Sequence, residues 1–183
     1  MKRKLLSLLA FLAFCAIQCQ TPKQEKQTTT DTLGIPVEGS AESTLTQDAG
    51  CRWLKQQVAE YFSAGGNMEK MAAMTTPEYF QYKMDATNVD LDTDGSLSKV
   101  DFEKKWKDTY NTIHAGIGSG FLISGQDWGN IIVSTCDMVN ADSKQLTVKA
   151  LLSDCEFQTD YHREITLIKN GDGFRIQDVK EFD

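Results

Sequence analysis

Histidines, close cysteine pairs and long apolar runs are scarce in this chain, and each shortage excludes a class of protein. The 183 residues include two histidines, His114 and His162, and no nucleophile–base–acid set can be assembled around them. No two cysteines have the Cys-x-x-Cys spacing of a redox motif or a zinc site. The longest apolar run, residues 5–17, is broken only by Ser7 and is too short to span a bilayer comfortably.

Basic residues are also few, since the chain has 19 of them and 26 acidic residues, which gives a formal net charge of −7. Without residues 1–19, which carry three basic side chains, 16 basic residues remain against 26 acidic ones, a charge of −10. This balance argues against nucleic acid or an anionic membrane surface as a partner. It favours a soluble surface that tolerates cations.

The first 19 residues have the pattern of a secretory signal peptide. Lys2, Arg3 and Lys4 precede the apolar run, and Cys19 follows it. The arrangement resembles a bacterial lipoprotein signal, in which the cysteine becomes the acylated first residue, although Gln18 stands where a small residue is expected. We therefore expect a lipid anchor at Cys19 in the membrane of the bacterial cell envelope. Ordinary secretion, which would give a periplasmic or secreted protein, is the alternative.

Residues 20–49 have the composition of a linker. They contain Pro22 and Pro36, two of the three prolines, and are rich in Gln, Thr, Lys, Glu and Ser. Too few of them are apolar to offset the entropy cost of ordering, so we predict a disordered tether. Residues 50–183 are long enough for a single domain with one core.

Residues 90–101 carry the one definite chemical motif of the chain. Three aspartates stand two residues apart, Gly95 follows them, Leu97 is apolar, and a fourth aspartate closes the segment. This order resembles an EF-hand calcium loop, whose oxygen ligands surround the cation as the backbone turns. The resemblance implies these ligands: Asp90, Asp92, Asp94, Ser96 through its carbonyl, Ser98 through a water, and Asp101.

Two features depart from the EF-hand pattern. Asp101 stands where a longer glutamate is usual, and no second loop of this kind is present, although EF-hands usually work in pairs. We expect a weak site for Ca²⁺, with a dissociation constant of roughly 10⁻⁴–10⁻³ M. The alternative is an ordinary turn at Asp94 and Gly95, followed by a capping box from Ser98 to Asp101 that starts the next helix.

The cysteines that follow the signal peptide are odd in number, so they can form at most one internal pair. A tight hairpin at residues 140–143 would place Cys136 opposite Thr147 rather than Cys155. Cys51 could therefore pair with either of the other two. Three reduced, buried thiols are an equally open alternative.

Helical periodicity dominates the first half of the domain. Apolar residues at positions 53, 54, 58, 61 and 62 share one helix face, and that helix should end at Gly65 and Gly66. A short helix over 68–74 follows, and Thr76 with Pro77 predicts the start of a third. Apolar residues at 102, 106, 110 and 113 indicate a fourth. The glycine-rich residues 115–120 lack the strand and the lysine of a phosphate-binding loop, so we predict a flexible connection.

Strand patterns begin at residue 131. Residues 131–139 are rich in β-branched side chains, and apolar residues alternate from 146 to 152. Two further strands, 165–168 and 174–179, flank a tight turn at Asn170 and Gly171. Helices followed by an antiparallel meander predict an α+β fold with N-terminal helices packed on a four-stranded antiparallel sheet.

This order of elements, with the ending at residues 173–179, resembles the nuclear-transport-factor-2-like fold, in which helices and a curved sheet form a cone. The segment 125–128, Gly-Gln-Asp-Trp, is similar to a family of bacterial lipoproteins with that fold, domain of unknown function 3828. The resemblance covers residues 52–182 and implies a fold and an envelope location, but no activity. The acidic loop has no counterpart in this pattern, so we interpret it as an insertion.

Asp127 and Trp128 are candidate pocket residues, because an acid beside a tryptophan could line the mouth of the cone. A capping aspartate and a core tryptophan explain the pair equally well. We predict a membrane-tethered binding or interaction module that holds a small apolar ligand or a protein partner. A small-molecule enzyme of the isomerase or dehydratase kind, using the cone pocket, is the alternative. A cone filled by its own aromatic side chains would favour a structural or interaction role.

Overall fold

The computed structural model describes residues 39–182, with side chains from Asp48 onward. The predicted signal peptide, Cys19 and residues 20–38 of the predicted tether lie outside the described residues. Residues 39–49, which we predicted as part of the tether, belong to the first helix. No proline lies between Pro36 and Pro77, so the sequence contains no stop signal that would prevent this helix from starting early.

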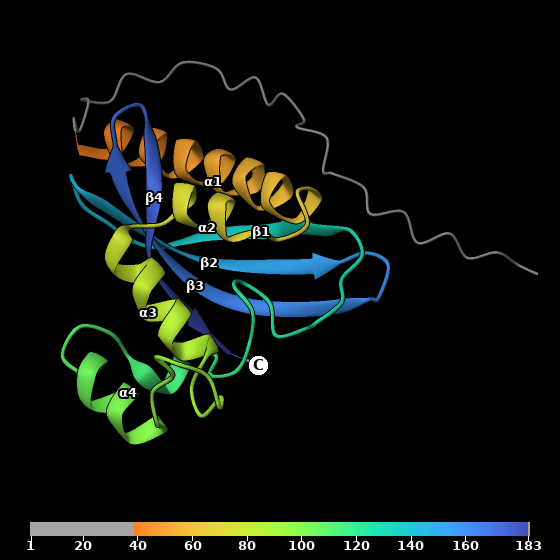
Figure 1. Ribbon diagram of the computed structural model, residues 1–183. Helices are drawn as coiled ribbons and strands as arrows, with labels where there is room; N and C mark the ends of the chain where they lie inside the picture. Colours follow the sequence, from red (N-terminus) through yellow and green to blue (C-terminus); the bar gives the residue numbers. More distant parts are fainter. Residues whose placement is uncertain (1–38, 183) are drawn as a thin grey trace, which may run out of the picture. The chain divides into compact units, whose positions relative to one another are not determined.

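The fold is α+β, as predicted (Figure 1). The helices are α1 (Gly39–Ser63), α2 (Met68–Met74), α3 (Pro77–Thr87), α4 (Lys99–Trp106) and the 3₁₀-helix η1 (Thr112–His114). The strands are β1 (Ile131–Ala141), β2 (Gln145–Asp154), β3 (Thr159–Asn170) and β4 (Gly173–Glu181). They form a 4-stranded antiparallel sheet in the order β1-β2-β3-β4.

Capping residues set the helix boundaries where the sequence predicted them. α1 ends before Gly65 and Gly66, which adopt left-handed φ values of 75° and 64° and donate their N–H groups to carbonyls of the last helical turn. α3 begins after Thr76, whose hydroxyl accepts the N–H of Tyr79, and Pro77 occupies its first turn.

The helix predicted over residues 102–113 is shorter than expected, because α4 ends at Trp106. Tyr110 is still buried, but Ile113 is 86% exposed instead of lying on the buried face. The side chain of Asn111 accepts the N–H of Ile113 and caps η1. Short polar side chains compete with helical backbone hydrogen bonds in this way, and periodicity alone does not report it.

Each strand pairs antiparallel with the next one along the chain, β1 with β2, β2 with β3 and β3 with β4. Asn170 lies opposite Gly173, with Gly171 at φ 59°, as the Asn-Gly turn predicts. The β1–β2 turn lies later than predicted, because β1 continues to Ala141 and contains two register shifts. Cys136 consequently lies opposite Ala150, and the predicted pairing with Thr147 is wrong.

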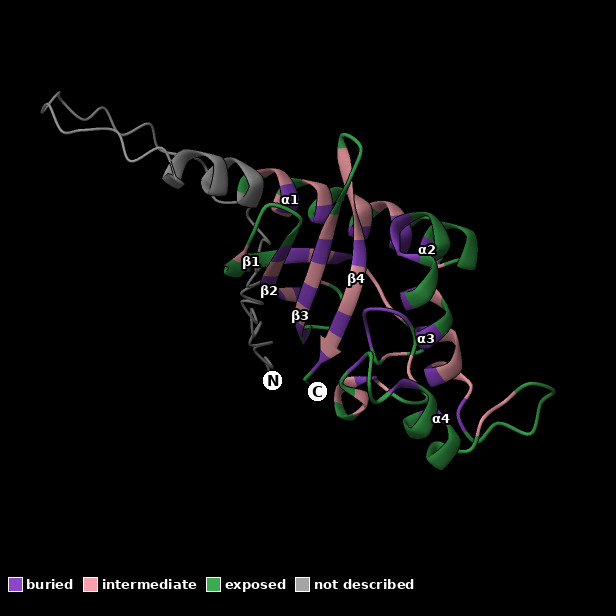
Figure 2. Ribbon diagram, turned by 90° about the vertical axis from the view of Figure 1, so that its left-hand side faces the viewer, coloured by how far each residue is buried: buried purple, intermediate pink, exposed green. Residues whose placement is uncertain are grey.

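Buried and less buried residues alternate along the strands, so the two faces of the sheet differ (Figure 2). Along β2, Leu146, Val148, Ala150 and Leu152 are buried on the face that the helices cover, as the alternation predicts. The residues between them are exposed or half-buried and lie on the opposite face, which we call the outer face. A parallel bridge from Thr75 to β4 places the α2–α3 connection along the edge of the sheet.

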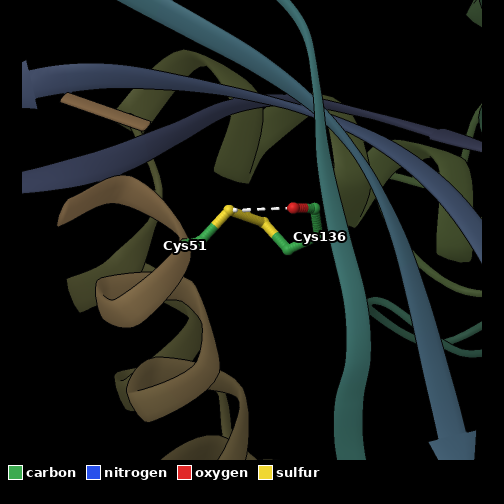
Figure 3. Close-up of a disulfide and its surroundings, with 2 residues drawn as sticks. All are labelled: Cys51 and Cys136. Atoms are coloured by element: carbon green, nitrogen blue, oxygen red, sulfur yellow. Dashed lines mark hydrogen bonds between the residues drawn. A yellow bond between two sulfur atoms is a disulfide. The ribbon is translucent and has the colours of Figure 1, made fainter. Parts of the chain in front are cut away.

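A disulfide joins α1 to β1 (Figure 3). The sulfur atoms of Cys51 and Cys136 are 2.05 Å apart, and the bond spans 85 sequence positions. The sequence left Cys136 and Cys155 open as partners of Cys51, and in the structure the partner is Cys136. The Cys51 sulfur also lies 3.4 Å from the carbonyl oxygen of Cys136. A disulfide sulfur carries no hydrogen, so this is a close contact and not a hydrogen bond.

Candidate functional site: the acidic loop and a buried charge cluster

The acidic loop connects α3 to α4, so the segment has the helix–loop–helix order of an EF-hand. Asp85 of α3 ties the two helices together, because its carboxylate accepts hydrogen bonds from Lys105 Nζ at 2.7 Å and Trp106 Nε1 at 2.8 Å. Burial alone would raise the pKa of Asp85, but these bonds and one from Gln81 hold it below its usual value. The two helices are therefore held together independently of any cation.

Two residues with left-handed backbone conformation shape the loop. Gly95 has a φ of 86° and supplies the sharp bend that the sixth position of a calcium loop requires. Asp90, the first predicted ligand, has a φ of 58°. Its N–H donates to the carbonyl of Leu97 at 2.9 Å, and its Oδ1 accepts the N–H of Lys99 at 3.3 Å. The first ligand position thus lies beside the start of α4.

The predicted ligand side chains do not converge. The four loop aspartates are exposed. Among the residues that the structure describes, no group of three His, Cys, Asp or Glu side chains is arranged to hold a metal ion. The Ser96 hydroxyl lies against the carbonyls of Asn88 and Leu91. The Ser98 hydroxyl accepts the N–H of Asp101 at 3.1 Å and donates to Asp101 Oδ2 at 2.7 Å. Ser98 is therefore the N-cap of α4, as the alternative prediction has it, but the Asp101 carboxylate accepts the Ser98 hydroxyl in place of the backbone N–H of a full capping box.

The fit to calcium is therefore partial. The bend at Gly95, the backbone bond between Asp90 and Leu97 and the flanking helices match an EF-hand loop. Binding requires the exposed carboxylates to turn inward and Asp101 to leave the Ser98 hydroxyl. That rearrangement costs free energy, which a bound cation would have to offset.

Aromatic side chains pack together between α3, α4 and the connection that follows them. Tyr82 stacks on Phe102 and on Tyr110, with ring centroids 5.5 Å and 4.2 Å apart. Tyr79 contacts Tyr82 at 5.8 Å and Phe121 at 6.3 Å. Each of these five side chains is at most 6% exposed. These rings therefore form a packed core, whereas the sequence had left open whether the interior is open or filled.

Asp127 and Trp128 lie on the segment before β1. Asp127 is exposed at the surface. Trp128 packs edge-on against Phe62 of α1, with ring centroids 5.5 Å apart, and lies close to Gly66. Neither residue lines the groove of the outer face described below. Trp128 therefore contributes to the packing of α1, as our core interpretation has it.

Three charged side chains are buried together where α3, β3 and β4 meet. Lys83 Nζ contacts Glu181 Oε1 at 2.5 Å, and an Arg163 guanidinium nitrogen lies 3.7 Å from Glu181 Oε2. The exposed fractions of the Lys83, Glu181 and Arg163 side chains are 1%, 4% and 0%. Buried charges are tolerated only when they are paired and hydrogen-bonded, so this charge cluster constrains its surroundings strongly.

The charge cluster also holds the glycine-rich connection in place. Lys83 Nζ donates to the carbonyls of Ala115 and Gly116 at 3.0 and 3.2 Å. Arg163 Nε donates to the carbonyl of Leu122 at 2.8 Å. Two buried cations thus bind the first two residues of the segment that we predicted to be a flexible connection and the backbone two residues beyond its end.

Sequence reasoning missed the charge cluster, although strand alternation carried a signal for two of its members. Arg163 lies two residues from buried Ile165 on β3, and Glu181 lies two residues from buried Val179 on β4. The two-residue period of a strand therefore places both charged side chains on the buried face. Helical spacing carried a signal for Lys83 too, because it lies four residues after Tyr79 and three before Ala86, which are both buried.

The outer face of the sheet carries a groove of about 590 Å³, lined in part by His162. A row of alternating charges crosses this face, because Asp137, Lys149, Glu164 and Lys180 are successive register partners from β1 to β4. Lys180 Nζ donates to Glu164 Oε1 at 2.6 Å. Opposite charges alternate along the row, so it presents no excess of one sign.

No protein-family model, no curated protein and no solved structure matches this chain. Across residues 39–182, none of the helices is both long enough and apolar enough to cross a membrane. The functional conclusion depends on the sequence motifs and the geometry described above.

Proposed function

We propose that this chain is a binding or interaction module of the bacterial cell envelope, tethered to a membrane through Cys19, with a weak structural calcium site at residues 90–101. In this proposal residues 50–183 form a nuclear-transport-factor-2-like cone of the domain-of-unknown-function 3828 family. The open sheet with helices on one face supports the cone. The register shifts in β1 also support the cone, because β-bulges bend strands and a cone needs a curved sheet.

The packed aromatic interior is the observation that carries the interaction role. An enzyme or carrier that used the cone would need an interior space large enough for its substrate. Here Tyr79 of α3 and the inner-face side chains of Leu152 and Ile165 are at most 1% exposed, so side chains fill that space. A small ligand or a protein partner would instead be recognised at the surface.

Two further features support an envelope location. Disulfides persist in oxidising compartments such as the bacterial periplasm, and Cys51 and Cys136 form one. The acidic balance of the chain, 26 acidic residues against 19 basic ones, suits a surface that meets divalent cations.

One observation favours the alternative of a small-molecule enzyme of the isomerase or dehydratase kind. Burial raises the pKa of the Asp178 carboxyl group to about 6, a value suited to proton transfer near neutral pH. Burial raises the pKa values of Tyr79 and Tyr82, and the nearby charges of Glu181 and Asp178 raise them further. Asp178 does not line the groove of the outer face, so we rank this alternative second.

Calcium should raise the melting temperature of the protein. The ion would relieve repulsion among the carboxylates of Asp90, Asp92, Asp94 and Asp101 and steady the start of α4. For a dissociation constant of ~0.1–1 mM, about 1 mM Ca²⁺ should add roughly 0.4–1.4 kcal/mol to the free energy of unfolding. Thermal denaturation over 0.1–10 mM Ca²⁺ measures this gain, which should exceed that from Mg²⁺.

Three variants make the calcium experiment specific. Asp90→Ala should abolish the gain, and Asp101→Glu should increase it because the longer side chain reaches bidentate coordination. Asp172→Ala removes an exposed acid from the β3–β4 turn and should leave the response unchanged. A melting temperature indifferent to Ca²⁺, or an equal response in Asp90→Ala, would leave the loop as a capped acidic turn.

A further inference from the structure

The outer face of the sheet carries four charged side chains in a line, one from each strand, which we call the charge row. They are successive register partners, and their signs alternate from β1 to β4 in the order Asp137, Lys149, Glu164 and Lys180. Glu164 and Lys180 pair with each other at 2.6 Å. Asp137 and Lys149 are exposed, and within the described part of the chain their side chains form no ion pair or hydrogen bond. Half of the charge row is therefore available to a partner.

The order of the signs makes the charge row complementary to a second copy of itself. The row begins with an acid and ends with a base, so reversing it gives the opposite sign at every position. A two-fold axis that runs parallel to the strands, between β2 and β3, produces this reversal, because it sets β1 of one copy against β4 of the other. Asp137 then faces the second copy's Lys180, and Lys149 faces the second copy's Glu164.

The other face-to-face arrangement of two copies has no such complementarity. A two-fold axis along the charge row sets each strand against its own counterpart, so that Asp137 meets Asp137 and Lys149 meets Lys149. Like charges opposed in this way cost free energy. Under the axis parallel to the strands, Asp178 faces Asn140, which lies at the same register level on β1, so this acid meets a neutral amide.

A neighbouring level of the sheet fits the same symmetry. Thr135 pairs with Leu151, and Leu151 pairs with His162. Phe182 donates its N–H to the carbonyl of His162 at 3.1 Å. All four residues line the groove of about 590 Å³, which also contains three members of the charge row. The symmetry brings the Phe182 ring, which is 44% exposed, over the second copy's Thr135 and so into its groove. Burial of this ring adds an apolar contact to the ion pairs.

The size of the outer face determines the strength expected of this contact. Four strands about 4.8 Å apart and about ten residues long present on the order of 600 Å². A standard interface takes about 800 Å² from each partner, and smaller ones are typical of transient complexes. The contact is therefore weak, and the dimer forms in proportion to the protein concentration.

We propose that the outer face of the sheet is the contact between two copies of this chain, related by a two-fold axis parallel to the strands. Asp137 and Lys180 form the outer ion pairs of this contact, and Lys149 and Glu164 form the inner ones. Each pair occurs twice, because the symmetry repeats it. The contact depends on neither the calcium site nor the lipid anchor, so its test is independent of the proposed function.

Carbodiimide cross-linking identifies the strands that meet. The reagent joins a carboxylate to an amine that is in contact with it. Within one chain Asp137 and Lys180 are three strand spacings apart, about 14 Å, so a link between them arises only between copies. The full chain, mixed with an equal amount of its ¹⁵N-labelled form, should give this link in peptides of mixed isotope composition. Glu164 and Lys180 touch within one chain and supply the positive control. The control link without the mixed Asp137–Lys180 link would overturn the proposal.

A matched pair of lysine variants tests the charges. Lys149→Glu sets an acid against Glu164 at both symmetry-related contacts and should weaken self-association at least about tenfold in sedimentation equilibrium. Lys55→Glu makes the same change in net charge at an exposed position of α1 and should change self-association by less than about twofold. Added salt should weaken the dimer of the parent protein, because it screens the exposed pairs. A parent protein that stays monomeric up to about 1 mM, or equal weakening in the two variants, would refute the contact.

Discussion

Gly116 is the single residue at which the backbone and the buried charge cluster constrain each other most closely. It has a φ of 60°, and a β-carbon there would lie 2.1 Å from Glu181 Oε2 and 2.5 Å from Oε1. Gly116→Ala should lower the free energy of unfolding by at least about 2 kcal/mol. It adds left-handed strain and pushes the Glu181 carboxylate away from Lys83. Urea denaturation measures the loss.

Gly118 is the matched control for Gly116. It also has a left-handed φ, 73°, but no atom lies within 4 Å of the position of its missing β-carbon. Gly118→Ala should therefore cost only the backbone strain, about 1–2 kcal/mol. Equal losses at the two positions would show that the Glu181 carboxylate can move aside without penalty.

Asp178 makes stability depend on pH. Burial raises its pKa from 3.8 to about 6, Glu164 adds to the shift, and Lys180 and His114 oppose it. The folded state therefore favours the protonated carboxyl group. The resulting stability is fully present below pH 3.8 and is lost as pH rises through about 6.

Asp178→Asn should remove this dependence, because the amide stays neutral. Above pH 6.5 the variant should be more stable than the parent protein by about 1–3 kcal/mol, and near pH 4 the difference should approach zero. Urea denaturation at the two pH values measures both numbers, with Asp172→Asn as an exposed control. A difference that does not change with pH would contradict the raised pKa.

At the scale of elements, α1 is attached to the sheet by a covalent bond and by close packing. Cys51 bonds to Cys136 of β1. One residue earlier, Gly50 allows a close approach to β2, because a β-carbon there would lie 2.4 Å from Leu146 Cδ2. The helix and the two strands therefore form one unit in which the disulfide reinforces existing apolar contacts.

Removing both cysteines should destabilise the protein without changing its fold. The bond closes a loop of 85 positions, and cross-links of this span typically contribute about 2–4 kcal/mol. Cys51→Ala/Cys136→Ala should therefore melt several degrees lower while keeping the same far-UV circular dichroism. Peptide mapping under non-reducing conditions should find the 51–136 bridge in the parent protein. An unbridged map or an unchanged melting temperature would contradict this role.

At the scale of the whole molecule, the proposed envelope role depends on an anchor that lies outside the described residues. If Cys19 is acylated, Cys19→Ser should move the protein from the membrane fraction to the soluble fraction, because the acyl chains supply the membrane affinity. Metabolic labelling with a fatty acid should mark the parent protein and not the variant. Membrane retention or labelling that persists in the variant would refute the anchor.

Local sequence signals determined the elements and most of their boundaries. Thr76 with Pro77, the pair Gly65-Gly66, and Asn170 with Gly171 act through a few neighbouring residues, so their structural effect can be predicted without the rest of the chain. Strand alternation likewise determined which face of β2 is buried. The α+β class and the order of the helix–loop–helix around the acidic loop follow from signals of this local kind.

Tertiary structure decided whatever depends on residues far apart in the chain. The partner of Cys51, the register of Cys136, and the meeting of Lys83 with Glu181 across 98 positions all require the sheet and helices to be assembled. The aromatic filling of the interior is a question of volume, which no periodicity reports. The convergence of the loop carboxylates depends on side-chain directions around the bend at Gly95, whereas the sequence specifies only their order.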